Sequence, residues 1–345
     1  MVPLNSGPDA GAADSVDDDR TLSDTGEWGL VAALQRRLPP GDGVVLGPGD
    51  DAAVVSAPDG RVVVSVDLLV DTVHFRRDWA APQEIGARAA AASLADVAAM
   101  GATPTALVVG LAAPPDLPVA WALRLADGLR DEAARVGASV VGGDVAASTQ
   151  LMVSVTALGD LGGRPPVTRS GAEAGDQVAI AGRLGWAAAG LAVLRRGFGS
   201  PRALVDAYRR PQPPYEAGVA AALAGATSMI DTSDGLVADL GHVATASGVG
   251  IDLWTERFEV AEPLTSLAAA YGREVWPWVL EGGDDHALAA TFPPGATLPE
   301  GFSVIGEVVA LAAGGDRSRD RAGWVHVDGE PWPGTGGHEH YRGTR

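Results

Sequence analysis

Aspartates that follow glycine or end an apolar run occur in both halves of this 345-residue chain, and they constrain how it folds. They lie in Gly49-Asp50-Asp51, Ser65-Val66-Asp67, Gly142-Gly143-Asp144, Asp231-Thr232-Ser233-Asp234-Gly235 and Gly282-Gly283-Asp284-Asp285. A carboxylate is costly to bury unless a cation or hydrogen bonds compensate its charge. Oxygen ligands suit hard cations, and Mg²⁺ usually works together with phosphate groups. The pattern therefore predicts a site that holds several metal ions and handles a polyphosphate.

Asp96 supports the same prediction from a different setting. It lies in the alanine-rich residues 89–102, inside a helix expected over residues 82–100. Nearly all its neighbours are apolar, so no polar helix face explains the charge. A metal-ligand role is favoured, and a buried hydrogen-bonding role is the alternative.

Lysine is absent, since all 25 basic residues are arginine. The absence excludes a P-loop and the protein-kinase signature, both of which place a lysine against the phosphates of the nucleotide. It also excludes chemistry through a lysine Schiff base. If the chain uses ATP, it binds the nucleotide in another way.

Composition and charge restrict the partners. The formal net charge of −19 makes nucleic acid and anionic membrane surfaces unfavourable partners. With no cysteine, the chain has no disulfide, thiol nucleophile or cysteine-bound zinc. No apolar run is long enough to span a membrane and no signal peptide is evident, so a cytoplasmic protein is expected.

The order of expected elements indicates an α/β (α+β) chain of two domains. Residues 1–22 are expected to be a disordered acidic tail, 23–160 an N-terminal domain and 161–345 a C-terminal domain, with the boundary in the Gly- and Pro-rich residues 159–175. Helices are expected at 26–38, 82–100, 118–136, 186–196, 201–208, 215–223 and 236–247. Strands are expected at 61–66, 105–111, 139–141, 151–158, 177–181, 251–253 and 303–311, with one more after the 282–285 turn.

Several motifs also have simpler explanations. Gly142-Gly143-Asp144 is expected to be a turn that binds phosphate or metal, although Gly-Gly-Asp alone is weak support. Ser233 or Asp234 is expected to cap the following helix, whose N-terminus also favours phosphate. Arg169, in Thr168-Arg169-Ser170-Gly171, suits phosphate but equally suits an interdomain loop.

Taken in order, these segments resemble the thiamine-monophosphate kinase family, within the aminoimidazole-ribonucleotide synthetase (PurM-like) superfamily. Each segment alone is a weak signal, whereas eight in the same order are specific. The matching segments are residues 26–30, 49–51, 65–75, 93–102, 140–144, 168–171, 231–236 and 282–288.

The resemblance implies an N-terminal ATP-binding α/β domain whose sheet pairs with a second subunit, and a C-terminal α/β domain that completes the active site. It also implies roles for particular residues in binding metal, nucleotide and substrate. It implies no side chain that acts directly as an acid or base. The implied metal ligands are Asp51, Ser65, Val66 (through its carbonyl), Asp67, Asp96, Asp144, Asp231 and Asp234. The implied nucleotide contacts are Gly143, Asp144, Arg169 and Ser233, and the implied substrate contacts are His74, Asp284 and Tyr341. Position 284 usually holds Glu in this family, and His286 replaces a common Tyr.

The implied reaction transfers a phosphoryl group from ATP to the phosphate of thiamine monophosphate, assisted by several Mg²⁺ ions, in a homodimer. Another ATP-dependent synthetase of the superfamily, such as aminoimidazole-ribonucleotide synthetase, is the alternative. A noncatalytic Ca²⁺-binding module would show repeated Asp-x-Asp-x-Asp-Gly loops, and the sequence contains none.

Overall fold

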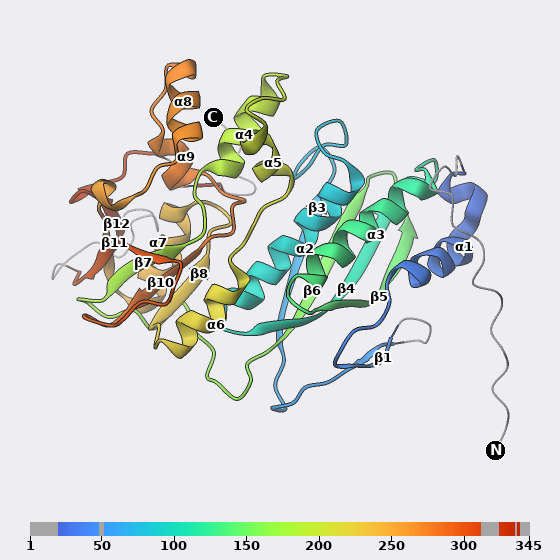
Figure 1. The fold of residues 1–345 in the computed structure, drawn as a ribbon, viewed down its shortest axis with the longest axis horizontal. Coiled ribbons are helices and arrows are strands. Elements are labelled where there is room, and N and C mark those ends of the chain that lie inside the picture. Colours follow the sequence, from blue (N-terminus) through green and yellow to red (C-terminus); the bar gives the residue numbers. More distant parts are fainter. Residues whose placement is uncertain (1–19, 48–51, 312–323, 335–336, 339–345) are drawn as a thin grey trace.

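The computed structural model describes residues 20–47, 52–311, 324–334 and 337–338, and it contains two large β-sheets with helices packed on them (Figure 1). The first sheet has the strand order β3-β6-β4-β5 and the second β13-β12-β9-β11-β7-β10-β8. The first comprises β3 (Val63–Val70), β4 (Thr103–Ala113), β5 (Ser139–Ala147) and β6 (Met152–Asp160). The second comprises β7 (Gln177–Ala181), β8 (Ser228–Asp231), β9 (Gly250–Leu253), β10 (Leu288–Phe292), β11 (Phe302–Val309), β12 (Val325–Val327) and β13 (Glu330–Pro331). The short strands β1 (Val44–Leu46) and β2 (Val54–Val55) pair separately.

The helices lie before, between and after these strands. They are α1 (Leu22–Arg37), α2 (Pro82–Ala99), α3 (Val119–Ala134), α4 (Trp186–Arg195), α5 (Arg202–Arg209), α6 (Tyr215–Leu223), α7 (Leu236–Ser247), α8 (Glu262–Tyr271) and α9 (Trp276–Glu281), with a 3₁₀ turn at Thr255–Arg257. Figure 1 shows α2 and α3 lying across one face of the first sheet, with α6 between that sheet and the second one. The α/β fold class expected from the sequence is confirmed.

The first sheet has one face covered by helices and one face open. Along β3, the side chains of Ser65 and Asp67 point toward α2, while those of Val64, Val66 and Leu68 are 60%, 62% and 50% exposed on the other face. Successive side chains of a strand alternate between faces, so this sequence places polar groups inside and apolar groups outside. An exposed apolar strip of this kind is typical of an interaction surface.

Helix α2 packs backbone to backbone against its neighbours. A methyl group added at Gly86 would lie 2.1 Å from the Leu125 carbonyl oxygen of α3, and one added at Gly128 would lie 2.0 Å from that of Gln83. A methyl group at Gly218 of α6 would lie 2.0 Å from the Ala98 carbonyl oxygen. Small residues are therefore required where α2 crosses α3 and α6, which explains the alanine-rich sequence.

One hydrophobic core joins the two halves of the chain. It includes Leu94 of α2 and Val155 of β6, and it continues to Met229 of β8, Leu288 of β10 and Phe292 of β10. A second core, on the other face of the second sheet, contains Leu204, Leu236 and Ile251. The two sheets are thus held together by buried apolar contacts, and α2 lies against β8 at their junction.

Four expectations are corrected by the structure. Gly142-Gly143-Asp144 is not a turn, because β5 continues through it to Ala147 beside β4. Helix α1 begins at Leu22 with Thr21 as N-cap and Asp24 at its third position, so it begins before the expected residue 26 and residues 20–22 do not belong to a tail. Helix α7 begins after Gly235, with no side-chain cap from Ser233 or Asp234. Helices α8 and α9 were not expected at all. Residues 1–19 lie outside the described residues.

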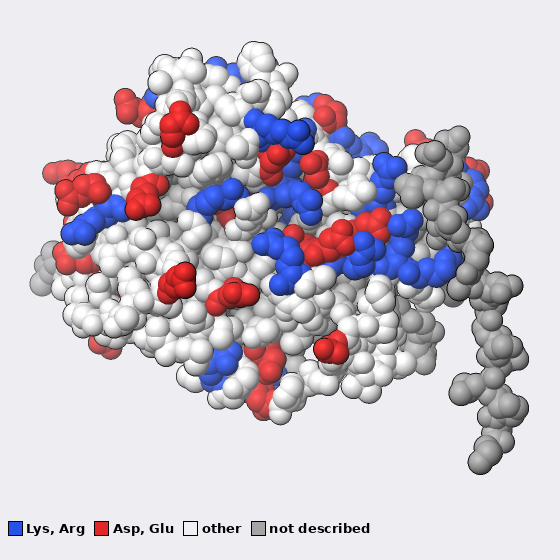
Figure 2. Space-filling view, viewed as in Figure 1, with Lys and Arg blue, Asp and Glu red and all other residues white. Residues whose placement is uncertain are grey.

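Charge is mixed on the face shown in Figure 2, where arginines lie beside acidic side chains in a band over α2, α3 and α5. Arg37 and Arg130 each lie 2.8 Å from a carboxylate oxygen of Asp127, for example. This face offers no continuous basic area of the kind that a nucleic acid backbone requires. Among the residues that the structure describes, no helix is long and apolar enough to cross a membrane.

Candidate active site

Strand β3 and helix α2 bring together Ser65, Asp67 and Asp96, which the sequence singled out, and add Ser93. Ser65 Oγ donates to Asp96 Oδ2 over 2.5 Å. Ser93 Oγ donates to Asp67 Oδ2 over 2.8 Å, and it also lies 3.0 Å from the Val155 carbonyl oxygen. The alternation of β3 and the three-residue spacing of Ser93 and Asp96 on α2 produce these two parallel contacts.

A third carboxylate reaches this place from the second sheet. Asp231 ends β8, is buried, and accepts a hydrogen bond at Oδ2 from His286 Nδ1 over 3.0 Å. Burial would lower the pKa of His286, but the hydrogen bond and charge of Asp231 outweigh it and raise that pKa to about 9. We call Asp67, Asp96 and Asp231, with their partners Ser65, Ser93 and His286, the carboxylate cluster.

The three carboxylates of the carboxylate cluster repel one another. Burial raises the pKa of Asp96 to about 7, and the negative charges of Asp231 and Asp67 add to the rise. Burial also raises the pKa of Asp67, with the charge of Asp231 in the same direction. Like charges in a poorly solvated place disfavour ionisation. A cation bound here would relieve the repulsion, so the chemistry of these donors fits a hard metal ion.

In the described part of the chain, no group of three or more His, Asp or Glu side chains is already arranged to hold a metal ion. The oxygens of Asp67 and Asp96 are instead held by the hydroxyls of Ser93 and Ser65. Asp51, another expected ligand, lies outside the described residues. Each hydroxyl contacts only Oδ2 of its carboxylate, so these hydrogen bonds are compatible with a metal ion bound to the same side chains.

The turn after β8 is shaped by Asp239, which the sequence analysis missed. Asp239 is buried in α7, and its Oδ2 accepts the backbone N–H groups of Asp234 (3.1 Å) and Gly235 (3.0 Å). Burial raises its pKa well above the ordinary value, with the charges of Asp231 and Asp234 in the same direction. A lone carboxylate in an apolar helix was the signal that identified Asp96, and the same signal applied to α7 would have found Asp239.

The 282–286 turn packs on the same segment. The backbone N–H of Asp284 donates to the Ser233 carbonyl oxygen over 3.0 Å, and that of His286 donates to the Thr232 carbonyl oxygen over 3.1 Å. Asp284 (φ 67°) and His286 (φ 51°) both have left-handed backbones, which are uncommon for residues with side chains. The two Gly-Asp segments of the C-terminal half are thus neighbours, with Ser233 exposed and Asp234 half-buried between them.

Asp144 lies apart from the carboxylate cluster. It is on β5, three strands away from β3, so its backbone is about 14 Å away at the usual spacing between strands. The strand register places Asp144 beside Gly110, Ser154 and Leu68, on the open face of the sheet. Asp67 lies on the opposite face. Within one chain, the expected metal ligands therefore divide into two groups.

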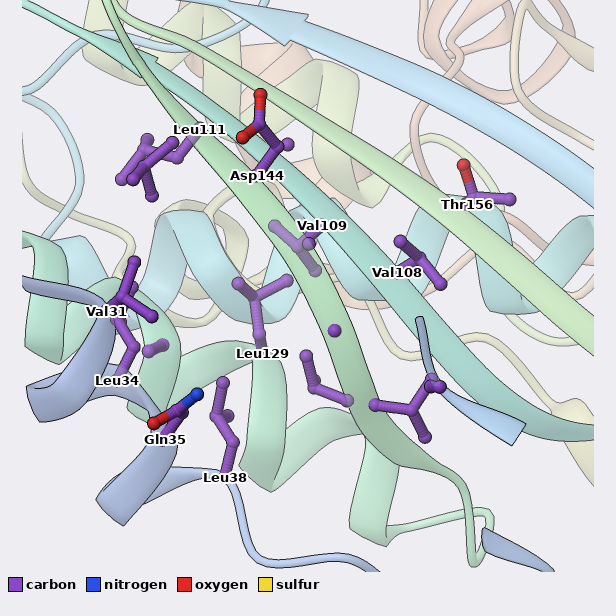
Figure 3. A pocket seen from close by; sticks show the side chains of 18 of the residues that line it. Val31, Leu34, Gln35, Leu38, Val108, Val109, Leu111, Leu129, Asp144 and Thr156 are labelled. Carbon is purple, nitrogen blue, oxygen red and sulfur yellow. The ribbon is translucent and has the colours of Figure 1, made fainter. Parts of the chain in front are cut away.

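Asp144 borders a large cavity that extends round the β5 edge of the first sheet, from its open face to α1 and α3 (Figure 3). The cavity has a volume of about 1070 Å³. Its floor is apolar, with Leu34 of α1 and Leu129 of α3, while Gly143, Asp144 and Thr156 contribute polar groups. A mostly apolar recess with a few polar side chains at separate places around it, such as Gln35, Asp144 and Thr156, suits a small organic ligand (Figure 3).

Three of the remaining expected residues, Val66, His74 and Arg169, belong to the described part of the chain. Val66 directs its side chain to the open face, so only its backbone is available to the carboxylate cluster. His74 follows β3 and accepts at Nδ1 from the Val70 N–H over 3.0 Å. Arg169 is exposed in a segment beside β8, where the Met229 N–H donates to the Thr168 carbonyl oxygen over 3.3 Å. Tyr341 lies outside the described residues.

Comparison with known proteins identifies the family. Residues 49–161 match the family described as AIR synthase related protein, N-terminal domain. Over 318 residues, the chain is 49% identical to a protein of Mycobacterium tuberculosis named thiamine-monophosphate kinase, and the match covers 92% of each chain. The chain belongs to the thiamine-monophosphate kinase family. The resemblance drawn from the eight sequence segments is thereby confirmed.

Solved structures of thiamine-monophosphate kinases have the same fold. One from Stenotrophomonas maltophilia is 29% identical, with a TM-score of 0.75 over 88% of this chain and 96% of that one. Another, named "AaThiL complexed with AMPPCP and TMP", is 29% identical, with a TM-score of 0.73 over 92% of this chain and 98% of that one. That kinase was thus captured with two ligands whose names denote an ATP analogue and thiamine monophosphate.

Proposed function

We propose that this protein transfers the γ-phosphoryl group of ATP to the phosphate of thiamine monophosphate, which yields ADP and thiamine diphosphate. The observation that carries the proposal is the match over 92% of the chain to a thiamine-monophosphate kinase, together with the carboxylate cluster at the junction of the two sheets. We further propose two domains, residues 23–160 and 161–345, with the cluster between them.

The chemistry suits a phosphate acceptor. The attacking oxygen is already anionic, so no side chain needs to remove its proton. The difficulty is repulsion, since two unit charges about 4 Å apart repel by about 4 kcal/mol at an effective dielectric constant of 20. Mg²⁺ ions, when bound, neutralise phosphate charge and stabilise the transferring group.

Asp67, Asp96 and Asp231 are our proposed principal metal ligands, with Ser65, the Val66 carbonyl, Asp51 and Asp234 as further ones. Asp144 would hold metal at the separate β5 position. The raised pKa values of Asp67 and Asp96 support this assignment, because carboxylates that repel one another gain most from a bound cation.

The cavity beside β5 is our proposed nucleotide site. Gly143 and Asp144 line it, and the apolar side chains of α1 and α3 would cover the base. Arg169 and Ser233 are proposed phosphate contacts from the second half of the chain. His74, Asp284 and Tyr341 are proposed contacts for thiamine monophosphate.

A homodimer is proposed through the open face of the first sheet. Val64, Val66 and Leu68 form an apolar strip there that α2 and α3 do not cover. Size-exclusion chromatography with light scattering tests this interface. Val64→Glu should give monomers, whereas Leu223→Glu, at an apolar residue of α6 that is 71% exposed against 60% for Val64, should leave the dimer intact. Dimers in both variants would count against the interface.

The activity is tested by ADP release with three acceptors, namely thiamine monophosphate, thiamine and an aminoimidazole precursor. We expect release with thiamine monophosphate only, and we expect activity to rise with Mg²⁺ added beyond the amount that binds ATP. Efficient phosphorylation of free thiamine, with the monophosphate untouched, would overturn the proposal. Turnover of the aminoimidazole precursor would favour the synthetase alternative.

A further inference from the structure

Arg88 is a buried cation on α2 that the sequence analysis did not single out. Its side chain is 7% exposed, and it lies eight residues before Asp96 on the same helix. A charged side chain in such a place requires compensation by hydrogen bonds or by an opposite charge. The partners of Arg88 therefore indicate why the chain keeps a cation there.

Three contacts hold the guanidinium, and all come from the C-terminal half of the chain. Nη1 donates to the Tyr208 carbonyl oxygen over 2.6 Å, and the guanidinium carbon lies 4.4 Å from the centre of the Tyr208 ring. Nη2 lies 2.8 Å from Asp284 Oδ2. Arginine suits this arrangement, because its planar fork serves a carbonyl group, an aromatic face and a carboxylate at once.

The two members of the ion pair differ in exposure. The Asp284 side chain is 46% exposed, whereas that of Arg88 is enclosed. Asp284 projects from the strained 282–286 turn, and its backbone is tied to Ser233. Arg88 thus orients the carboxylate of Asp284 from behind, while the rest of that carboxylate faces open space.

We infer that Arg88 is a positioning residue, which fixes the Asp284 carboxylate for the organic part of the substrate. The inference rests on the proposed function, in which Asp284 contacts thiamine monophosphate. A carboxylate repels phosphate and attracts cationic or N–H groups, and thiamine carries both a thiazolium cation and an amino group. Arg88 itself does not reach the ligand, because its side chain is enclosed behind Asp284 and Tyr208.

The test compares ligands with and without the phosphate. In Arg88→Gln, the KM for thiamine monophosphate and the calorimetric Kd for unphosphorylated thiamine should rise by the same factor, about tenfold, or about 1.4 kcal/mol. The KM for ATP and the kcat at saturation should stay within about twofold. Arg88→Lys should lie in between, because it keeps the charge and loses the fork.

Asp284→Asn should weaken the two thiamine ligands in the same way, and the double variant should be no worse than either single variant, since residues that act through one contact are not additive. Because Asp284 is half exposed, this variant tests the inference even if Arg88→Gln fails to fold. If the losses of thiamine affinity in the two single variants instead added up in the double variant, the inference would be overturned.

Tyr215→Phe is the matched control. Tyr215 OH donates to Glu132 over 2.8 Å, and that buried contact also joins α6 to α3. Its loss should lower the melting temperature and leave the thiamine constants unchanged. A loss confined to the phosphorylated ligand in Arg88→Gln would make Arg88 a phosphate contact and overturn the inference. Wild-type protein that binds thiamine but releases no ADP with its monophosphate would refute the proposed function alone.

Discussion

The two edges of the first sheet carry aspartates in opposite settings. At the β3 edge, Asp67 and Asp96 are half-buried where α2 packs on β3, and burial and mutual repulsion raise their pKa values. At the β5 edge, Asp144 is exposed on the open face and borders a wide cavity. Aspartate therefore has a different environment at each edge. A positive charge would stabilise the ionised Asp67 and Asp96, whereas water already solvates Asp144.

The comparison predicts a very large effect at the β3 edge. Asp96→Asn should lower kcat at least 100-fold, because a ligand of the metal ions that neutralise phosphate charge is lost. The Asn oxygen still accepts from Ser65, so the melting temperature of the metal-free protein should not fall. Steady-state kinetics and a thermal melt in a chelator check both parts. Normal turnover would mean that Asp96 is no ligand.

Alanine substitutions at Gly143 and Gly142 test the role of backbone packing at the β5 edge. A methyl group at Gly143 would lie 1.9 Å from the Val109 carbonyl oxygen, whereas one at Gly142 would meet no atom of the described residues within 4 Å. Gly143→Ala should therefore destabilise the protein by about 2–3 kcal/mol, as overpacked sites do. Gly142→Ala should change the free energy of unfolding by less than about 0.5 kcal/mol. Denaturant unfolding of both variants measures the difference, and equal values would refute the packing explanation.

Asp144→Asn should have a moderate effect that spares stability. We expect the KM for ATP to rise about tenfold, which corresponds to about 1.4 kcal/mol of binding free energy. The reason is the loss of one charge near the phosphates or their metal. The melting temperature should remain unchanged, since the side chain is exposed. If instead this variant matches Asp96→Asn in kcat, the two edges form one site.

Asp285 provides a buried carboxylate outside the cluster, and its predicted effect is the smallest. Its Oδ1 accepts from the Ala187 N–H over 2.9 Å, and burial raises its pKa to about 7. A folded-state pKa above the unfolded value costs stability once the pH exceeds the unfolded value, and the cost is complete above pH 7. Asp285→Asn should therefore raise the melting temperature more at pH 8 than at pH 4. Melting curves at both pH values test the sign.

Most of the long helices and strands were predicted from the sequence, and so were the three aspartates of the carboxylate cluster. Helix α2 was expected from its run of small residues and strand β3 from its valines, and Asp96 was noticed because nothing local explained its charge. The predicted end of β5 was wrong, because consecutive glycines usually mark a turn. Here Gly143 is required instead by the close backbone of β4, which leaves no room for a side chain. Such a contact between strands leaves no trace in a local pattern.

The division of the aspartates into two groups was also beyond the sequence. It depends on the strand order β3-β6-β4-β5, which separates Asp67 from Asp144, and on a register that places them on opposite faces. Both are properties of the whole sheet. The partner of Arg88 was equally hidden, because Asp284 follows it by almost 200 residues and only the packing of α2 on the C-terminal half brings them together.

The glycine crossings of α2 have a consequence for motion. At Gly218 and Ala98, backbone touches backbone across the junction of the two halves, with no long side chain to slide or change rotamer. A hinge needs loop or terminal residues that absorb changes of backbone angle. The contact between Gly218 and Ala98 instead joins the backbones of two helices directly. Substrate capture should therefore proceed without rotation of one half against the other, so that single-molecule distances between α3 and α8 stay constant through the catalytic cycle.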